Sequence, residues 1–176
     1  MSGPSGGPVV TDLYVSWDQY NESIERLAVA LRNSRWEFNQ IICIARGGMR
    51  VGDILSRIFR QSLAIISTQS YLGEAGDERG ELTVARHMTM SSAALGDRVL
   101  LVDDLVDSGI TLDVVKRHLL AEFPAIQEIR TAVLWYKACS NYVPDYYVSY
   151  LTESPWIHQP FEKYDMMKPD DLPESG

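Results

Sequence analysis

Acidic and hydroxyl side chains cluster in one stretch of the chain, directly after an apolar run. The stretch reads Val99-Leu100-Leu101-Val102-Asp103-Asp104-Leu105-Val106-Asp107-Ser108-Gly109-Ile110-Thr111. Its leading apolar residues would form a buried strand that delivers Asp103 and Asp104 to the strand end. The Ser108 and Thr111 hydroxyls and the N–H groups of the turn between them can bind a phosphate at a helix N-terminus. The acids can hold a divalent metal ion or accept hydrogen bonds from ribose hydroxyls.

Each part of this stretch, taken alone, also has an ordinary structural explanation. An aspartate at a strand end often caps the next helix, and Ser-Gly is a common turn. The receiver domains of two-component signalling also place paired acids at strand ends. Two acids alone therefore do not identify a function, and the interpretation has to rest on the complete string.

The elements that would position these acids alternate along the chain. Apolar spacings of three and four predict a helix over about 17–33, a second over about 50–60 and a third that Pro124 ends. Buried strands are expected at 41–45, 62–68, 99–102, 129–135 and 146–151, with 82–88 as a further candidate. This alternation predicts an α/β domain with a central, mainly parallel sheet flanked by helices. In such sheets, ligands bind beyond the carboxyl ends of the strands.

Composition and charge narrow the classes of function. The 176 residues, 45% hydrophobic and 23% charged, predict one globular domain. The net charge of −8 repels polyanions, so neither nucleic acid nor an anionic membrane is an expected partner. No apolar run approaches the ~20 residues that a transmembrane helix needs. Cys43 and Cys139 lie in apolar runs and are expected to be buried free thiols of a cytoplasmic protein.

The complete string closely resembles the phosphoribosyl-pyrophosphate signature of type I phosphoribosyltransferases. Further segments match bacterial xanthine-guanine phosphoribosyltransferases in the expected order: residues 14–18, 41–48, 70–71, 137 and 155–161. The resemblance covers about residues 14–162 and implies the type I phosphoribosyltransferase fold, with a small hood over the active site built from terminal segments. We expect a flexible tail over 1–12, the phosphoribosyltransferase domain over 13–165 and a C-terminal tail over 166–176.

The resemblance also assigns the residues that would bind phosphoribosyl pyrophosphate. Arg46, Gly47 and Gly48 would form the pyrophosphate loop, where the lack of a Cβ lets backbone N–H groups approach the anion. Asp103 and Asp104 would hold the ribose hydroxyls and Mg²⁺, with Asp104 as the metal ligand. The 5′-phosphate would be bound by Ser108, Gly109, Ile110 and Thr111, and Asp107 would also contact phosphoribosyl pyrophosphate.

Base recognition and proton transfer are assigned in the same way. Asp107 would act as the general base that takes the proton from the purine ring nitrogen. Lys137 would donate to the 6-oxo group, and a donor-only ammonium favours that group over the amino group of adenine. Trp156 would stack on the base, while the backbone of Ile157 would bind another edge of the ring. His158 stands where relatives often carry a carboxylate, which leaves the choice among xanthine, guanine and hypoxanthine open.

A mobile loop is the remaining part of the resemblance. Ser70 and Tyr71 would begin a loop that closes over the pyrophosphate and excludes water, and Arg79 would clamp a phosphate from it. The segment from Gly73 to Gly80 is acidic, so its register against the family stays open.

The implied reaction transfers the 5-phosphoribosyl group from phosphoribosyl pyrophosphate to a 6-oxopurine and releases pyrophosphate. Mg²⁺ is the implied cofactor, and the implied assembly is a dimer or tetramer of identical subunits. The alternative is a regulator of the same fold that binds nucleic acid and senses a ribose-phosphate ligand. The negative charge of the chain argues against the regulator, as do Lys137 and Trp156, which a sensor would not need.

Overall fold

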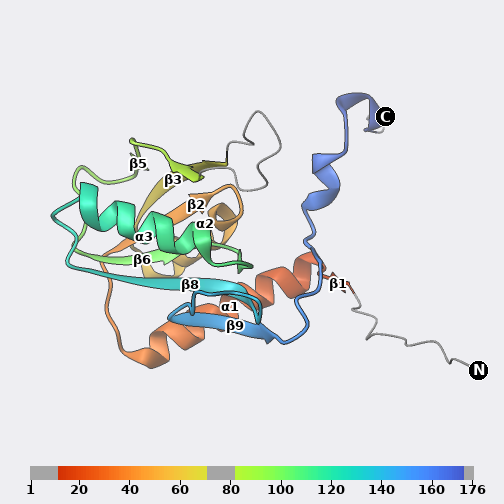
Figure 1. The fold of residues 1–176 in the computed structure, drawn as a ribbon, viewed down its shortest axis with the longest axis horizontal. Coiled ribbons are helices and arrows are strands. Elements are labelled where there is room, and N and C mark those ends of the chain that lie inside the picture. The colour runs from red at the N-terminus through yellow and green to blue at the C-terminus, as the bar shows by residue number, and fades with distance from the viewer. Residues whose placement is uncertain (1–11, 71–81, 173–176) are drawn as a thin grey trace, which may run out of the picture.

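A mostly parallel sheet forms the centre of the computed structural model, which describes residues 12–70 and 82–172 (Figure 1). Its strands are β2 (Gln40–Ala45), β3 (Ser62–Ser70), β4 (Leu82–Val84), β5 (Thr89–Met90), β6 (Arg98–Val102), β7 (Leu105–Val106), β8 (Glu128–Lys137) and β9 (Tyr146–Leu151). The strand order is β4-β3-β2-β6-β8-β7, with β5 paired to β3 and β9 paired to β8. Only β4 and β5 run antiparallel to their neighbour. The predicted α/β class is therefore confirmed.

Helices cover both faces of this sheet. They are α1 (Trp17–Ser34), α2 (Gly48–Phe59) and α3 (Ile110–Glu122). Neighbouring residues of a strand point to opposite faces, so Ile41 and Cys43 pack with α1 and α2, whereas Ile42 and Ile44 pack with α3. Because both faces are covered, a central strand needs apolar side chains at nearly every position. This requirement is why unbroken apolar runs predicted the strands correctly.

The ends of the chain meet in a second, two-stranded sheet. Strand β1 (Leu13–Tyr14) pairs in parallel with β10 (Ile157–His158), with Leu13 opposite Ile157. The Tyr14 ring stacks on the His158 ring at a centroid distance of 4.3 Å. Two short 3-10 helices, Glu162–Asp165 and Pro169–Asp171, follow. These terminal segments form the small hood that the resemblance implied.

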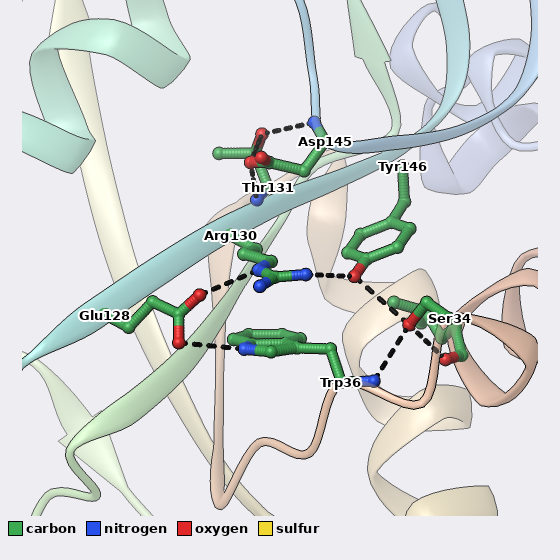
Figure 2. A network of polar contacts seen from close by, with 8 residues as sticks. Ser34, Trp36, Glu128, Arg130, Thr131, Asp145 and Tyr146 are labelled. Carbon is green, nitrogen blue, oxygen red and sulfur yellow. Dashed lines mark hydrogen bonds and ion pairs between the residues drawn. The ribbon is translucent and has the colours of Figure 1, made fainter.

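A polar network fixes the edge strand β9 against α1 and β8 (Figure 2). The Glu128 carboxylate accepts from Trp36 Nε1 at 2.9 Å and from Arg130 Nε at 2.8 Å. Arg130 also donates to the Tyr146 hydroxyl at 3.0 Å, and its guanidinium lies 4.7 Å from the centre of the Trp36 ring. The Tyr146 hydroxyl in turn donates to Ser34 Oγ at the end of α1. This anchoring holds the strand from which the chain continues into the hood.

The candidate strand over 82–88 is shorter than expected. Strand β4 ends at Val84, and β5 begins only at Thr89. Both strands pair antiparallel with β3, but their registers differ by two residues, so the chain between them leaves the ladder. Apolar content alone does not reveal such a change of register.

The remaining boundaries differ little from expectation. Helix α2 begins at Gly48, about two residues earlier than the apolar spacing indicated, since its first turn carries few apolar side chains. Lys137 is the last residue of β8 rather than a residue beyond it. In the described part of the chain, no helix has the length and apolarity needed to cross a membrane.

Candidate active site

The sequence-predicted residues gather at the carboxyl ends of the central strands. Two cavities that are lined by the predicted acids open there. One, of about 810 Å³, lies between the loop after β2 and the hood, and the other, of about 220 Å³, lies within residues 103–112. Asp104 lines both cavities. A ligand with a charged group at each end could therefore extend through both cavities and contact Asp104 between them.

Asp103 and Asp104 are held tightly by backbone groups at the end of β6. The Asp103 carboxylate accepts from the Asp104 N–H at 2.9 Å, and the Asp104 carboxylate accepts from the Leu105 N–H at 2.8 Å. Burial raises the pKa of Asp103 well above its usual range, and the neighbouring charge of Asp104 raises it further. Carboxylates whose ionisation is disfavoured in this way are common at sites that bind a ligand or a metal.

The loop after β2 lies against Asp104 and has no room for a side chain there. A Cβ on Gly47 would lie 2.6 Å from the Asp104 carboxyl carbon, and one on Gly48 would lie 2.5 Å from the Val102 carbonyl oxygen. The Ala45–Arg46 peptide bond that opens the loop is cis. Arg46 is exposed and pairs with Asp165 of the hood at 3.5 Å. The predicted pyrophosphate loop therefore lies beside the predicted metal ligand.

The turn before α3 has the features of a phosphate site. Gly109, with a φ of 86°, precedes the helix and has no side chain to cap it, while the N–H of Ile110, the first helical residue, donates to Ser108 Oγ at 3.4 Å. Ser108 and Thr111 line the smaller cavity with Gly109. The Ile110 side chain is 58% exposed and is not packed into the core. At this position a ligand would therefore be bound by the backbone N–H group. The helix dipole favours an anion at this place.

Asp107 and Lys137 meet across this turn. The Lys137 ammonium lies 3.5 Å from Asp107 Oδ2, and the Lys137 side chain is only 8% exposed while that of Asp107 is 61% exposed. A buried ammonium needs a partner of this kind. The pair therefore places a donor-only cation beside an accessible carboxylate, which is the combination expected for oxopurine binding and proton removal.

Cys139 corrects one expectation. Its side chain is exposed, not buried, and its thiol lies 3.2 Å from Asp107 Oδ1. The strand β8 ends at Lys137, so the apolar run no longer implies burial two residues later. Cys43 is buried as predicted, and both cysteines are free.

The hood carries the predicted base-binding residues. Trp156 is 64% exposed, as a ring that stacks on a ligand would be, whereas Ile157 is buried. The Trp156 carbonyl accepts from the Leu13 N–H at 2.8 Å, which fixes its backbone to β1. His158 lies 2.9 Å from the Asp12 carboxylate, so its imidazole is engaged within the hood.

Two further side chains in the larger cavity were not assigned roles from the sequence. Gln159 of the hood donates through Nε2 to Asp104 Oδ2. The Arg50 guanidinium lies 4.2 Å from the centre of the Phe161 ring, which ties α2 to the hood. Gln159 belongs to the matched segment 155–161, but a contact with a residue 55 positions away has no signal in a single sequence.

The predicted mobile loop lies outside the described residues, apart from Ser70 at its beginning. Ser70 is the last residue of β3. Tyr71 and Arg79 lie outside the described residues.

The donor set suits magnesium bound together with a substrate. Among residues 12–70 and 82–172, no group of three or more His, Cys, Asp or Glu side chains could hold a metal alone. Mg²⁺ is usually held by one or two carboxylates, with phosphate oxygens and waters completing its shell. Asp104 fits a site of that type, because Asp103 lies beside it and the turn before α3 follows in the same cavity.

Comparison with known proteins agrees with this arrangement. Residues 16–165 match the family described as the phosphoribosyl transferase domain. The chain is 30% identical over 156 residues to the xanthine-guanine phosphoribosyltransferase of Gluconobacter oxydans (strain 621H), covering 88% of this chain and 87% of that protein. The crystal structure of a purine phosphoribosyltransferase from Pyrococcus horikoshii Ot3 has a TM-score of 0.71 at 30% identity, covering 89% of this chain and 98% of that one.

A more distant structure has the same fold. The xanthine-guanine-hypoxanthine phosphoribosyltransferase of Helicobacter pylori has a TM-score of 0.69 at 21% identity, covering 90% of this chain and 96% of that one. The family match spans most of the chain and includes the acids, the glycine loop and the lysine described above. The protein therefore belongs to the phosphoribosyltransferase family and has its type I fold.

Proposed function

We propose that this protein transfers the 5-phosphoribosyl group from phosphoribosyl pyrophosphate to a 6-oxopurine, namely xanthine, guanine or hypoxanthine. The products are the nucleoside monophosphate and pyrophosphate. The observation that supports this most directly is the buried Lys137 ammonium beside the accessible Asp107 carboxylate, next to the N-terminus of α3, where Gly109 has no side chain to cap the helix. The names of the relatives at 30% identity support a purine as the acceptor.

The proposed chemistry assigns one task to each carboxylate. The bond between C1′ and the pyrophosphate oxygen breaks, the bond between C1′ and the purine nitrogen forms, and Asp107 takes the proton from the purine. Asp103 stabilises the positive charge that develops on the ribose. Mg²⁺, held by Asp104 when bound, would supply charge neutralisation for the leaving pyrophosphate. The N–H groups of Gly47 and Gly48 bind the same pyrophosphate.

Turnover measurements test this proposal directly. The purified protein is incubated with phosphoribosyl pyrophosphate, Mg²⁺ and each of xanthine, guanine, hypoxanthine and adenine, and the nucleotide formed is quantified. We expect product from oxopurines and at most a far slower reaction with adenine, and omission of Mg²⁺ with a chelator present should stop the reaction. Absence of product from every base would refute the enzyme and favour the nucleic-acid-binding regulator.

Replacing Lys137 by glutamine should weaken selection of the 6-oxo group. A hydrogen bond from a charged donor is worth about 1.5–3 kcal/mol, so kcat/KM for guanine should fall by about 10–100-fold. The value of kcat/KM for adenine should fall less, because the Lys137 ammonium only donates and has no acceptor for the 6-amino group of adenine. The measurement is the ratio of kcat/KM for the two bases. Lys116→Gln on α3, outside both cavities, is the matched control, and an unchanged ratio in Lys137→Gln would contradict the assignment.

Alkylation should distinguish the two cysteines. Burial raises the pKa of Cys43 to about 11 and keeps that thiol unreactive, whereas Cys139 is exposed beside Asp107. Iodoacetamide should therefore modify Cys139 alone and lower turnover by about 10²-fold, since the adduct displaces the base and its partners. Phosphoribosyl pyrophosphate with Mg²⁺ should slow the modification. Peptide mass spectrometry and residual activity measure both effects, and a Cys139→Ser variant that is inactivated equally would refute this prediction.

Location and assembly are part of the same proposal. We place the enzyme in the cytoplasm and expect a dimer or tetramer of identical chains. Light scattering on the purified protein determines the mass of the assembly, and a monomer at the concentration used for turnover would refute that part.

A further inference from the structure

Gln159 is a buried amide with a single side-chain partner among the described residues. The residue is 6% exposed, and its Nε2 donates to Asp104 Oδ2. Because a carboxylate only accepts, the amide nitrogen must face Asp104 and the amide oxygen must face away. That oxygen, Oε1, is buried and has no hydrogen-bond partner within the part of the chain that the structure describes. Of the two polar ends of this buried amide, only the one that faces Asp104 makes a hydrogen bond among the described residues.

The partner of Gln159 is the carboxylate that joins the two cavities. Asp104 Oδ1 is occupied by the Leu105 N–H at 2.8 Å, and the Gly47 backbone lies too close to admit a Cβ. Gln159 is therefore the contact that the hood makes with this carboxylate, while the other two contacts come from the strand-end loops. A change in the position of Asp104 would be transmitted to the hood through this amide.

Gln159 is also joined closely to the predicted base-binding residues. It lies two residues after Ile157 and three after Trp156, on a backbone fixed by the pairing of β1 with β10. The Glu162 N–H donates to the Gln159 carbonyl at 3.0 Å, so the backbone on its other side is fixed as well. With both flanks held, the amide links Asp104 rigidly to the segment that carries Trp156.

From this placement we propose that Gln159 is a positioning residue that couples occupation of the phosphoribosyl pyrophosphate site at Asp104 to the binding of the purine under the hood. The inference rests on the proposed function, since it takes those two ligands as the substrates. Substrate at Asp104 would set the position of the amide and through it the position of Trp156. Each substrate should then raise the affinity for the other by the same factor.

Binding of an inert base measures this coupling without turnover. The probe is 9-deazaguanine, in which carbon replaces the attacking ring nitrogen, and its Kd is determined by calorimetry with and without phosphoribosyl pyrophosphate and Mg²⁺. The ratio of the two values should be about 5–150 for the unmodified protein, the usual range of coupling between sites. In Gln159→Met, which keeps the length of the side chain but not the donor, the ratio should fall close to 1.

Two further variants separate coupling from folding. Gln159→Asn keeps the amide but is one methylene too short to reach Asp104, so it should lose the coupling as Gln159→Met does. Gln40→Met is the matched control: Gln40 is also buried and donates to the carbonyls of Ile41 and Ser62, far from both cavities. It should lower thermal stability and keep the coupling ratio of the unmodified protein.

The outcomes distinguish failure of the inference from failure of the proposed function. A Gln159→Met or Gln159→Asn protein that binds the probe with the unmodified ratio would overturn the role of Gln159, while the parent still forms nucleotide. Loss of coupling in Gln40→Met to the same degree would also overturn it, because any buried defect would then suffice. A parent protein that forms no nucleotide from any base would instead refute the proposed function itself.

Discussion

Asp107→Asn should lower kcat by about 10²–10⁴-fold, the usual contribution of a general base. An amide of the same shape cannot take the proton from the purine nitrogen, so chemistry slows while the geometry of the turn stays. The variant also leaves the Lys137 ammonium, which is 8% exposed, without its carboxylate partner. We therefore expect a lower melting temperature together with the loss of turnover. Single-turnover kinetics at saturating substrates and a thermal melt measure the two effects separately.

An aspartate on α3, the helix that follows Asp107, provides the control for Asp107→Asn. Asp113 pairs with Arg117 at 2.8 Å on the exposed face of α3, one turn after the phosphate site. Asp113→Asn should leave kcat within about twofold, because surface ion pairs contribute about 0–1 kcal/mol and only to stability. A loss of less than tenfold in Asp107→Asn would mean that water or another group accepts the proton.

Asp103→Asn should have opposite effects on activity and on stability. Removal of one preorganised electrostatic group costs about 10²–10³-fold in kcat, and Asp103 is the group we place beside the ribose. The free protein should nevertheless become more stable at neutral pH. Burial and the charge of Asp104 hold the Asp103 pKa well above its usual range, so ionised Asp103 opposes folding, whereas asparagine carries no charge.

The pH dependence gives the sign of this stability effect. With its pKa raised by folding, Asp103 binds more protons in the folded than in the unfolded state, so stability falls as pH rises from about 3.9, the pKa of an unfolded aspartate, to the raised value. The gain of Asp103→Asn should be largest above this window and should shrink as pH approaches about 4. Thermal melts with a chelator and without substrate measure it, with Asp113→Asn as the reference. A variant less stable than its parent at neutral pH would show that the Asp103 hydrogen bond to the Asp104 N–H outweighs the repulsion.

Local patterns in the sequence were sufficient for the longer strands of the central sheet and for the turn that precedes α3. An apolar run such as 99–102 can be buried on both faces only as a central strand, and the acids that follow it must then lie at the strand end. The contact of Asp107 with Lys137 did not follow from these patterns, because the strand β7 that brings Asp107 beside β8 has only two residues.

Long-range contacts of short segments were the part that the sequence did not reveal. Strands β1 and β10 have two residues each and no periodicity that a pattern could detect. The donation from Gln159 to Asp104 depends on how the hood is seated, and the exposure of Cys139 depends on where β8 ends. Each of these features is decided by tertiary packing, which outweighs local preference for residues outside regular elements.

The pairing of β1 with β10 has a consequence for the order in which the protein is made. During synthesis the N-terminal part of a domain leaves the ribosome first, and its sheet can begin to assemble before the rest follows. Leu13, however, finds its partner only after Ile157 has emerged, which is later than every strand of the central sheet. The acids and the turn before α3 can therefore be in place on a nascent chain that still lacks the predicted base-binding residues of the hood. The hood is therefore the last part of the candidate site that can form during translation.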